Sequence, residues 1–167
     1  HYFARECVKM GYNVRVVFNY PIYLRIFHVI AGFIKNTLAS KFNTSVTAIY
    51  SNRDYEFEMD GVKVIRMPLF KPFPRCKVPK SSINKQINKI VDYCNKENFI
   101  PNTIVAHNFY PHLEIVNCLK KEYYSQAKSC VVVHKQNLKM LKYVPNFLQQ
   151  VNDLDIWGFR SIPLKRD

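Results

Sequence analysis

The sequence of 167 residues has few glycines, few acidic residues and no long uninterrupted apolar run. Only four glycines are present and no repeat or low-complexity tract occurs, which excludes collagen-like and linker-type chains. The longest apolar stretch, residues 21–42, is interrupted by Arg25, His28, Lys35 and Lys41. Its apolar runs are therefore far shorter than the about 18–20 residues that a membrane span needs. We expect this stretch to be a buried or interfacial amphipathic helix of a globular protein.

Motifs for metal binding and for common enzyme classes are also missing. The five cysteines are odd in number, and no two have the C-x-x-C spacing of zinc or redox sites. The five histidines are isolated from one another, so we expect no metal site. No serine-hydrolase, P-loop or zinc-protease signature occurs. These absences favour a cytosolic protein with reduced, structural thiols and no cofactor.

Positive charge, by contrast, is abundant. Lysine and arginine number 25 against 12 acidic residues, which gives a formal net charge of +13. Such a surplus favours an anionic partner, for which nucleic acid, an anionic membrane surface and a phosphorylated substrate are the three candidates. The basic residues are dispersed, and no helix-turn-helix, RRM or KH signature is present. A basic nucleic-acid-binding module is therefore kept as an alternative, while nucleic acid is not the partner we favour.

The first third of the chain alternates between helical and extended patterns. Residues 1–10 have helical spacing, and Gly11 is placed to end that helix. Residues 13–18 are β-branched and predict a strand. A second helix is expected over residues 23–42, followed by a strand over residues 45–50. A strand placed before the first helix would complete a βαβ unit.

A hairpin and a long helix follow. Residues 55–59 and 62–67 alternate on either side of Asp60-Gly61, which is a strong signal for a β-hairpin. The four prolines of residues 68–79 predict a loop. Residues 81–98 predict a helix, because one apolar stripe recurs along it at helical spacing: Ile83, Ile87, Ile90, Val91 and Cys94.

The last third predicts a β-α-β-α-β order. Apolar strands are expected over residues 102–107, 129–134 and 155–162, with helices within residues 111–124 and 135–152. Continuous apolar strands in this order predict an α/β fold with a parallel, Rossmann-like sheet that is covered by helices on both faces. We expect one domain over residues 1–167.

Polar side chains stand where these strands end, and ligands of such sheets bind at the carboxyl ends of the strands. His107 and Asn108 end the first strand, and His134 ends the second. The other candidates follow the second strand or end the third: Lys135, Gln136, Asn137, Arg160 and Ser161. Histidine can hydrogen-bond or polarise a ligand, and arginine forms paired hydrogen bonds with phosphate.

Five segments resemble, in order, the N-terminal domain of the family-4 (group 1) retaining glycosyltransferases. The segments are HYFARECVKMGYNVRVV, YEFEMDGVKVIRMPLF, NFIPNTIVAHNFYP, SCVVVHKQN and DLDIWGFRSIPLKRD. They resemble, respectively, the first helix and second strand, a later strand, two strand ends of the cleft and the close of the domain. One departure is Asn102, which stands where the family usually has aspartate.

The resemblance implies a GT-B enzyme, in which two Rossmann-like domains face each other across a cleft. This chain would be the acceptor-side half, and a nucleotide-sugar donor would bind a C-terminal domain that follows residue 167. The resemblance also places a first strand with a Gly-rich loop before residue 1, and it requires no metal. It implies a catalytic role for His134, with the other strand-end residues lining the acceptor and donor cleft. A surface polysaccharide or another glycan would be the product, and the chain alone would be inactive.

A basic segment next to Phe70 and Phe73 is the candidate for contact with an anionic membrane surface. Its residues are Arg75, Lys77, Lys80, Lys85 and Lys89. Cations beside aromatics suit anionic lipid headgroups, and a lipid-linked acceptor would place the enzyme on the inner face of the membrane. A solvated surface with no partner explains the same residues. A stand-alone Rossmann-like nucleotide- or sugar-binding protein is the remaining alternative.

Overall fold

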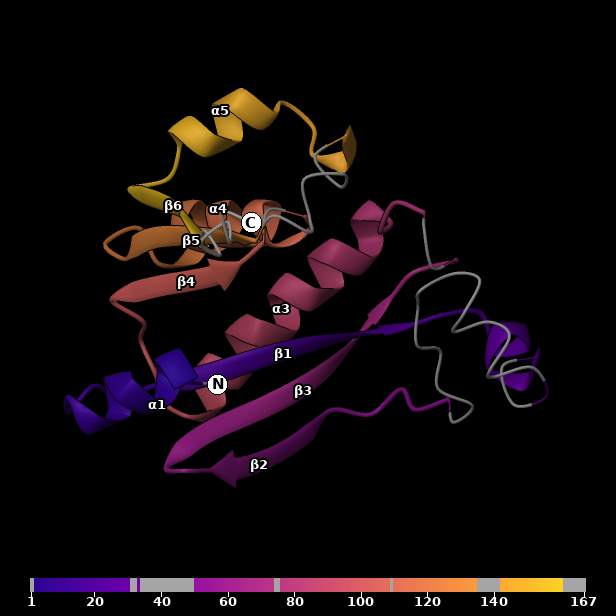
Figure 1. Cartoon of the computed structure of the whole chain (residues 1–167), viewed down its shortest axis with the longest axis horizontal. Helices are drawn as coiled ribbons and strands as arrows, with labels where there is room; N and C mark the ends of the chain where they lie inside the picture. The colour runs from indigo at the N-terminus through magenta and orange to yellow at the C-terminus, as the bar shows by residue number, and fades with distance from the viewer. Residues whose placement is uncertain are drawn as a thin grey trace, which may run out of the picture. The chain divides into compact units, whose positions relative to one another are not determined.

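The computed structural model describes residues 2–30, 33, 50–73, 76–108, 110–134 and 142–160, without the side chains of residues 134, 159 and 160. The fold is mixed α/β, with two three-stranded sheets and helices packed against them (Figure 1). The chain divides into two compact units, His1–Ser82 and Ile83–Asp167, which are described separately below. The α/β class predicted from the sequence is confirmed.

The first unit consists of a helix and a mixed sheet. Helix α1 (Tyr2–Lys9) precedes strands β1 (Arg15–Ile22), β2 (Tyr55–Met59) and β3 (Val62–Phe70). The strand order is β1-β3-β2, in which β1 runs parallel and β2 antiparallel to β3. Strand β1 is therefore an edge strand of this sheet among the residues that the structure describes.

Glycine ends α1 as predicted. Gly11 has a φ of +86°, and its N–H donates to the carbonyl of Val8 at 2.9 Å. The N–H of Tyr12 reaches back to the carbonyl of Cys7 at 3.1 Å, which completes a Schellman motif. The hairpin is also confirmed, because Asp60 and Gly61 have φ values of 52° and 75° and join β2 directly to β3.

Helix α1 covers part of one face of this sheet. Ala4 forms a buried cluster with Val62 and Val64 of β3. Valines of α1 and β1 and the Phe57 ring of β2 pack around this cluster. Strand β3 buries side chains on both faces along most of its length, as a central strand does.

Two sequence predictions in this unit need correction. Strand β1 continues to Ile22, and β3 runs through Pro68 to Phe70, so the predicted loop 68–79 begins only at Lys71. A proline is tolerated at this point because β2 pairs with β3 only as far as Arg66. Beyond that residue no described strand pairs with β3 on that side, so among the described residues the missing N–H leaves no ladder bond unmade.

The predicted helix over residues 23–42 is described only in part. Residues 25–30 and residue 33 are helical, whereas Tyr23 and Leu24 precede the helix. The other residues of that prediction lie outside the described part, as do residues 45–49 of the predicted strand. Tyr50 is described and is not in a strand.

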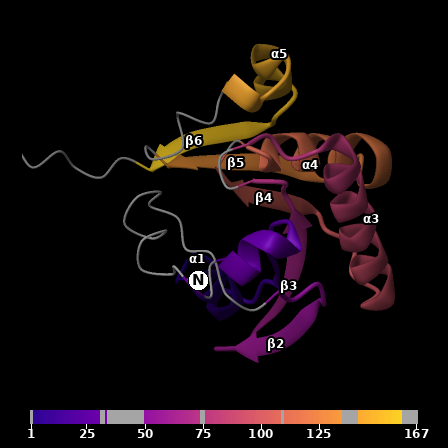
Figure 2. The same ribbon diagram turned by 90° about the vertical axis from the view of Figure 1, so that its right-hand side faces the viewer.

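The second unit holds the all-parallel sheet. Its strands are β4 (Thr103–His107), β5 (Lys128–His134) and β6 (Ile156–Arg160), in the order β4-β5-β6. Figure 2 shows these strands side by side. The β-α-β-α-β order predicted from the sequence is therefore confirmed for this part of the chain.

Helical segments precede and connect these strands. Helix α3 (Lys80–Lys96) precedes β4, and α4 (His112–Cys118) continues into a π-helical turn, η1 (Leu119–Tyr123). A short helix, α5 (Phe147–Asn152), precedes β6. The predicted stripe of α3 is largely confirmed, since Ile83, Ile87, Ile90 and Cys94 are buried while Val91 is half-buried.

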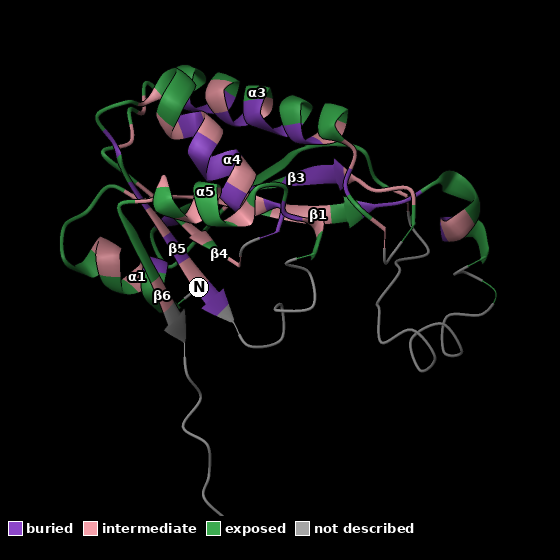
Figure 3. Ribbon diagram, turned by 90° about the horizontal axis from the view of Figure 1, so that it is seen from above, coloured by how far each residue is buried: buried purple, intermediate pink, exposed green. Residues whose placement is uncertain are grey.

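Helix α4 packs against β4, β5 and α5. Leu113 of this helix and Val131 and Val133 of β5 are completely inaccessible to solvent. On the opposite face of the sheet, Val105 and Ile156 are partly exposed, in register with Cys130 between them. Figure 3 shows buried residues along β5 and on α4.

Asp155 accepts hydrogen bonds that link the elements at the amino-terminal end of the sheet. Its Oδ2 accepts hydrogen bonds from the Lys120 ammonium at 2.6 Å, and from the N–H and hydroxyl of Ser129 at 2.6 and 2.9 Å. These hydrogen bonds hold the pKa of the Asp155 carboxyl well below its usual range, and the hydrogen bond from Lys120 contributes most. The contact joins η1, β5 and the start of β6, and it lies at the end of the sheet away from the predicted site.

Candidate functional site

The carboxyl edge of the parallel sheet carries the residues that the sequence singled out. Strand β4 ends at His107, β5 at His134 and β6 at Arg160. His107 is level with Val132, and His134 is level with Arg160 on the neighbouring strand. The structure therefore brings the backbones of three predicted strand ends to one edge, where ligands of parallel sheets bind.

His107 and Asn108 turn the chain away from the sheet. His107 is exposed, and Asn108 has a φ of 74°, a left-handed conformation that asparagine adopts more readily than most residues. The Asn108 N–H donates to the carbonyl of Val132 at 2.7 Å, which ties the turn to the end of β5. The Asn108 backbone thus has a defined structural role, whereas the exposed His107 side chain lies where a ligand could reach it.

His112, which the sequence analysis missed, is the first residue of α4. Its Nδ1 is buried and has no hydrogen-bond partner among the described residues. Burial, reinforced by the nearby His107 imidazole, lowers the pKa of the His112 side chain from 6.5 to about 4. At neutral pH this imidazole is uncharged, and its Nδ1 retains the capacity for one hydrogen bond. The only available signal in the sequence was a second histidine five residues after His107.

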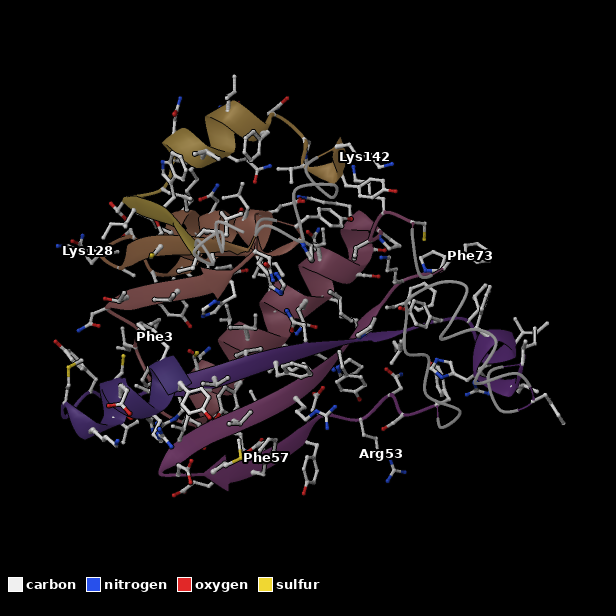
Figure 4. The ribbon with its side chains drawn as sticks, in the orientation of Figure 1. Phe3, Arg53, Phe57, Phe73, Lys128 and Lys142 are labelled. Atoms are coloured by element: carbon white, nitrogen blue, oxygen red, sulfur yellow. The ribbon has the colours of Figure 1, made fainter. Side chains whose placement is uncertain are left out.

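Aromatic side chains lie close to this turn. The Tyr110 ring is buried, and its centroid is 5.5 Å from that of Tyr143. The Lys142 ammonium stands 5.1 Å from the centroid of the Tyr143 ring, a cation–π distance. Lys142 is exposed and is labelled in Figure 4. The segment before α5 therefore brings an aromatic ring and a cation to the chain that follows β4.

The remaining predicted site residues are described in part or not at all. The backbones of His134 and Arg160 are placed in β5 and β6, but their side chains lie outside the described part. Lys135, Gln136, Asn137 and Ser161 also lie outside it. The roles assigned to these six side chains stay predictions.

The basic segment is described except for Arg75. Lys77, Lys80 and Lys85 are exposed, and Lys89 is half-buried one turn beyond Lys85 on α3. Phe73 is half-exposed, whereas Phe70 at the end of β3 is more buried. Exposed cations here are consistent both with an anionic partner and with a solvated surface.

Over the ranges that the structure describes, no group of three or more histidine, cysteine or acidic side chains could hold a metal ion. The five cysteines form no disulfide bond, and burial raises the pKa of the Cys130 thiol on β5. The described site therefore offers imidazole, amide, hydroxyl and ammonium groups as its chemistry. Comparison of the sequence with models of known protein families gives no match, and comparison with curated proteins gives no relative.

Proposed function

We propose that this chain is the acceptor-side domain of a retaining GT-B glycosyltransferase, which transfers a sugar from a nucleotide sugar to a glycan or lipid-linked acceptor. The observation that carries the proposal is the parallel sheet β4-β5-β6, whose carboxyl edge gathers His107, His134 and Arg160. Polar strand ends at one edge of a parallel sheet are the usual form of a binding site in α/β proteins. The ordered sequence resemblance supplies the reaction class.

The first unit supports the same architecture. Helix α1 leads into β1, and β1 has one edge with no partner strand among the described residues. A strand ahead of α1 would form a βαβ unit with β1 and would pair with that edge in parallel. This is the place at which the GT-B resemblance puts the first strand and its Gly-rich loop. The proposal also includes a Rossmann-like parallel sheet that is covered by helices on both faces.

In the proposed reaction the domain positions the acceptor and stabilises developing charge. His134 would face the donor sugar, and Arg160 on the adjacent strand would hold a phosphate group. The exposed His107 imidazole, on the acceptor side, would hydrogen-bond a sugar hydroxyl. Donor selection would be the task of a separate domain.

The parallel sheet can be tested for acceptor binding with a defined probe. We would titrate the chain with a short-chain prenyl diphosphate-linked sugar and follow backbone amide shifts by NMR. The proposal expects shifts at His107, Asn108 and His112 on the carboxyl edge. Lys128 and Asp155, at the amino end of the same sheet, serve as internal controls and should not shift. Shifts confined to the amino end, or no shifts at millimolar probe, would contradict the proposal.

A further inference from the structure

The described part of the helix that begins at Arg25, after β1, presents an apolar stripe to solvent. Ile26, Val29, Ile30 and Phe33 follow the i, i+3, i+4, i+7 spacing that places side chains on one helix face. All four are exposed, with Ile26 at 62%, Val29 at 59% and Phe33 at 86% of full exposure. Figure 3 colours most of the described part of this helix as exposed. Such a stripe normally faces the core of a protein, and here it faces outward.

The opposite side of the helix is already packed, which fixes its orientation. His28 is buried, and its Nε2 accepts a hydrogen bond from the Tyr23 N–H at 3.2 Å. The His28 ring meets Tyr50 edge to face at 5.2 Å, and Phe27 meets Phe73 in the same way at 5.2 Å. The helix therefore packs on the protein through Phe27 and His28, and the four residues of the stripe take no part in these contacts.

The charges around the stripe have one sign. The sequence holds no acidic residue between Glu6 and Asp54, and none between Asp60 and Asp92. The guanidinium of Arg25, on the same helix, is exposed and stands 5.4 Å from the centroid of the Tyr50 ring. Phe73, half-exposed and labelled in Figure 4, contacts Phe27 of the same helix and adds an aromatic ring. An apolar stripe beside a cation, in a stretch of sequence with no acidic residue, complements a surface with apolar depth and anionic headgroups.

We propose that Ile26, Val29, Ile30 and Phe33 insert into the interfacial layer of an anionic lipid membrane, with Arg25 at headgroup level. Among the described residues no helix is long and apolar enough to cross a bilayer, so the contact is peripheral. Nucleic acid offers no apolar layer for the stripe. The inference does not depend on the glycosyltransferase proposal, although a lipid-linked acceptor would agree with it.

Vesicle sedimentation tests the surface directly. The full chain is mixed with vesicles of equimolar phosphatidylglycerol and phosphatidylcholine, or of phosphatidylcholine alone. We expect binding to the anionic vesicles, weakened by salt. Ile26→Ser and Val29→Ser should each weaken it about tenfold, since each removes most of one inserted apolar side chain. Leu148→Ser is the matched control, because Leu148 is 76% exposed on α5, and this variant should bind as the parent does.

A fluorescence change on membrane binding distinguishes a loss of binding from unfolding of the serine variants. Phe33→Trp in a Trp157→Phe background places the single tryptophan in the stripe, and its emission should shift to the blue when anionic vesicles are added. A chain that stays in the supernatant, or serine variants that bind like the parent, would overturn the proposal. A parent chain that is dimeric by light scattering and becomes monomeric with Ile26→Ser would also overturn it, by showing that a second copy covers the stripe.

Discussion

Lowering the pH from 6.5 to 4 should destabilise the folded state through His112. The folded state lowers the pKa of this imidazole to about 4, against 6.5 for the unconstrained side chain, mainly through burial. Between these values the unfolded chain binds a proton that the folded chain excludes, so stability falls as the pH falls. The contribution is fully present above pH 6.5 and is lost progressively toward pH 4.

The size of the expected loss of stability follows from the shift in the pKa of His112. Each unit of pKa corresponds to about 1.4 kcal/mol, so by pH 4 the free energy of unfolding should drop by about 3 kcal/mol from this residue. Asp155 interferes little above pH 4.5, because its contribution falls only as the pH approaches the ordinary carboxyl pKa of 3.8 and drops below it. His112 therefore accounts for a specific part of the pH dependence.

Urea unfolding monitored by circular dichroism at pH 7.5, 6, 5 and 4.5 measures the loss. His112→Gln cannot titrate and should flatten the pH dependence over this range. His107→Gln is the control and should leave most of it, because burial is the larger cause of the shift. An NMR titration in which His112 protonates near pH 6.5, or a His112→Gln variant with the parent's pH dependence, would refute the reasoning.

Three further predictions concern stability. Gly61→Ala should destabilise the chain by about 1 kcal/mol, because its φ of 75° disfavours a side chain, whereas Gly158→Ala, at a strand position with open space around it, should change little in the same urea unfolding assay. Leu113→Ala should cost about 3 kcal/mol because it leaves a cavity under α4, while the exposed Leu148→Ala should be nearly neutral by thermal melting. Asp155→Asn should lower the melting temperature at neutral pH by weakening three hydrogen bonds, and an unchanged melting temperature would contradict the role given to that carboxylate.

Local chemistry predicted many of the elements. Asp60-Gly61 specified its turn because both residues tolerate positive φ, and Gly11 ended α1 for the same reason. The isoleucines of α3 revealed their buried face because helical spacing is visible in the sequence. The three parallel strands were recognisable from apolar runs that alternate with helices.

Features that depend on neighbours were not predictable. Pro68 was assigned to a loop because proline usually ends strands, and only the early end of β2 explains why β3 continues. His112 was missed because its distinction is a buried, unpartnered nitrogen rather than a motif. The outward stripe of the helix at residues 25–30 was expected to be buried or interfacial, and its exposure required coordinates to recognise.

The most direct test of the glycosyltransferase proposal is sugar transfer by this chain together with the donor-binding domain that the proposal expects. Radiolabelled nucleotide sugars would be offered with a prenyl diphosphate-linked acceptor, and the anomeric configuration of the product would be read by NMR. We predict transfer with retention, a loss of at least about a hundredfold with His134→Ala, and no loss with Lys128→Ala at the other end of β5. Absence of transfer with every donor, or full activity of His134→Ala, would contradict the account.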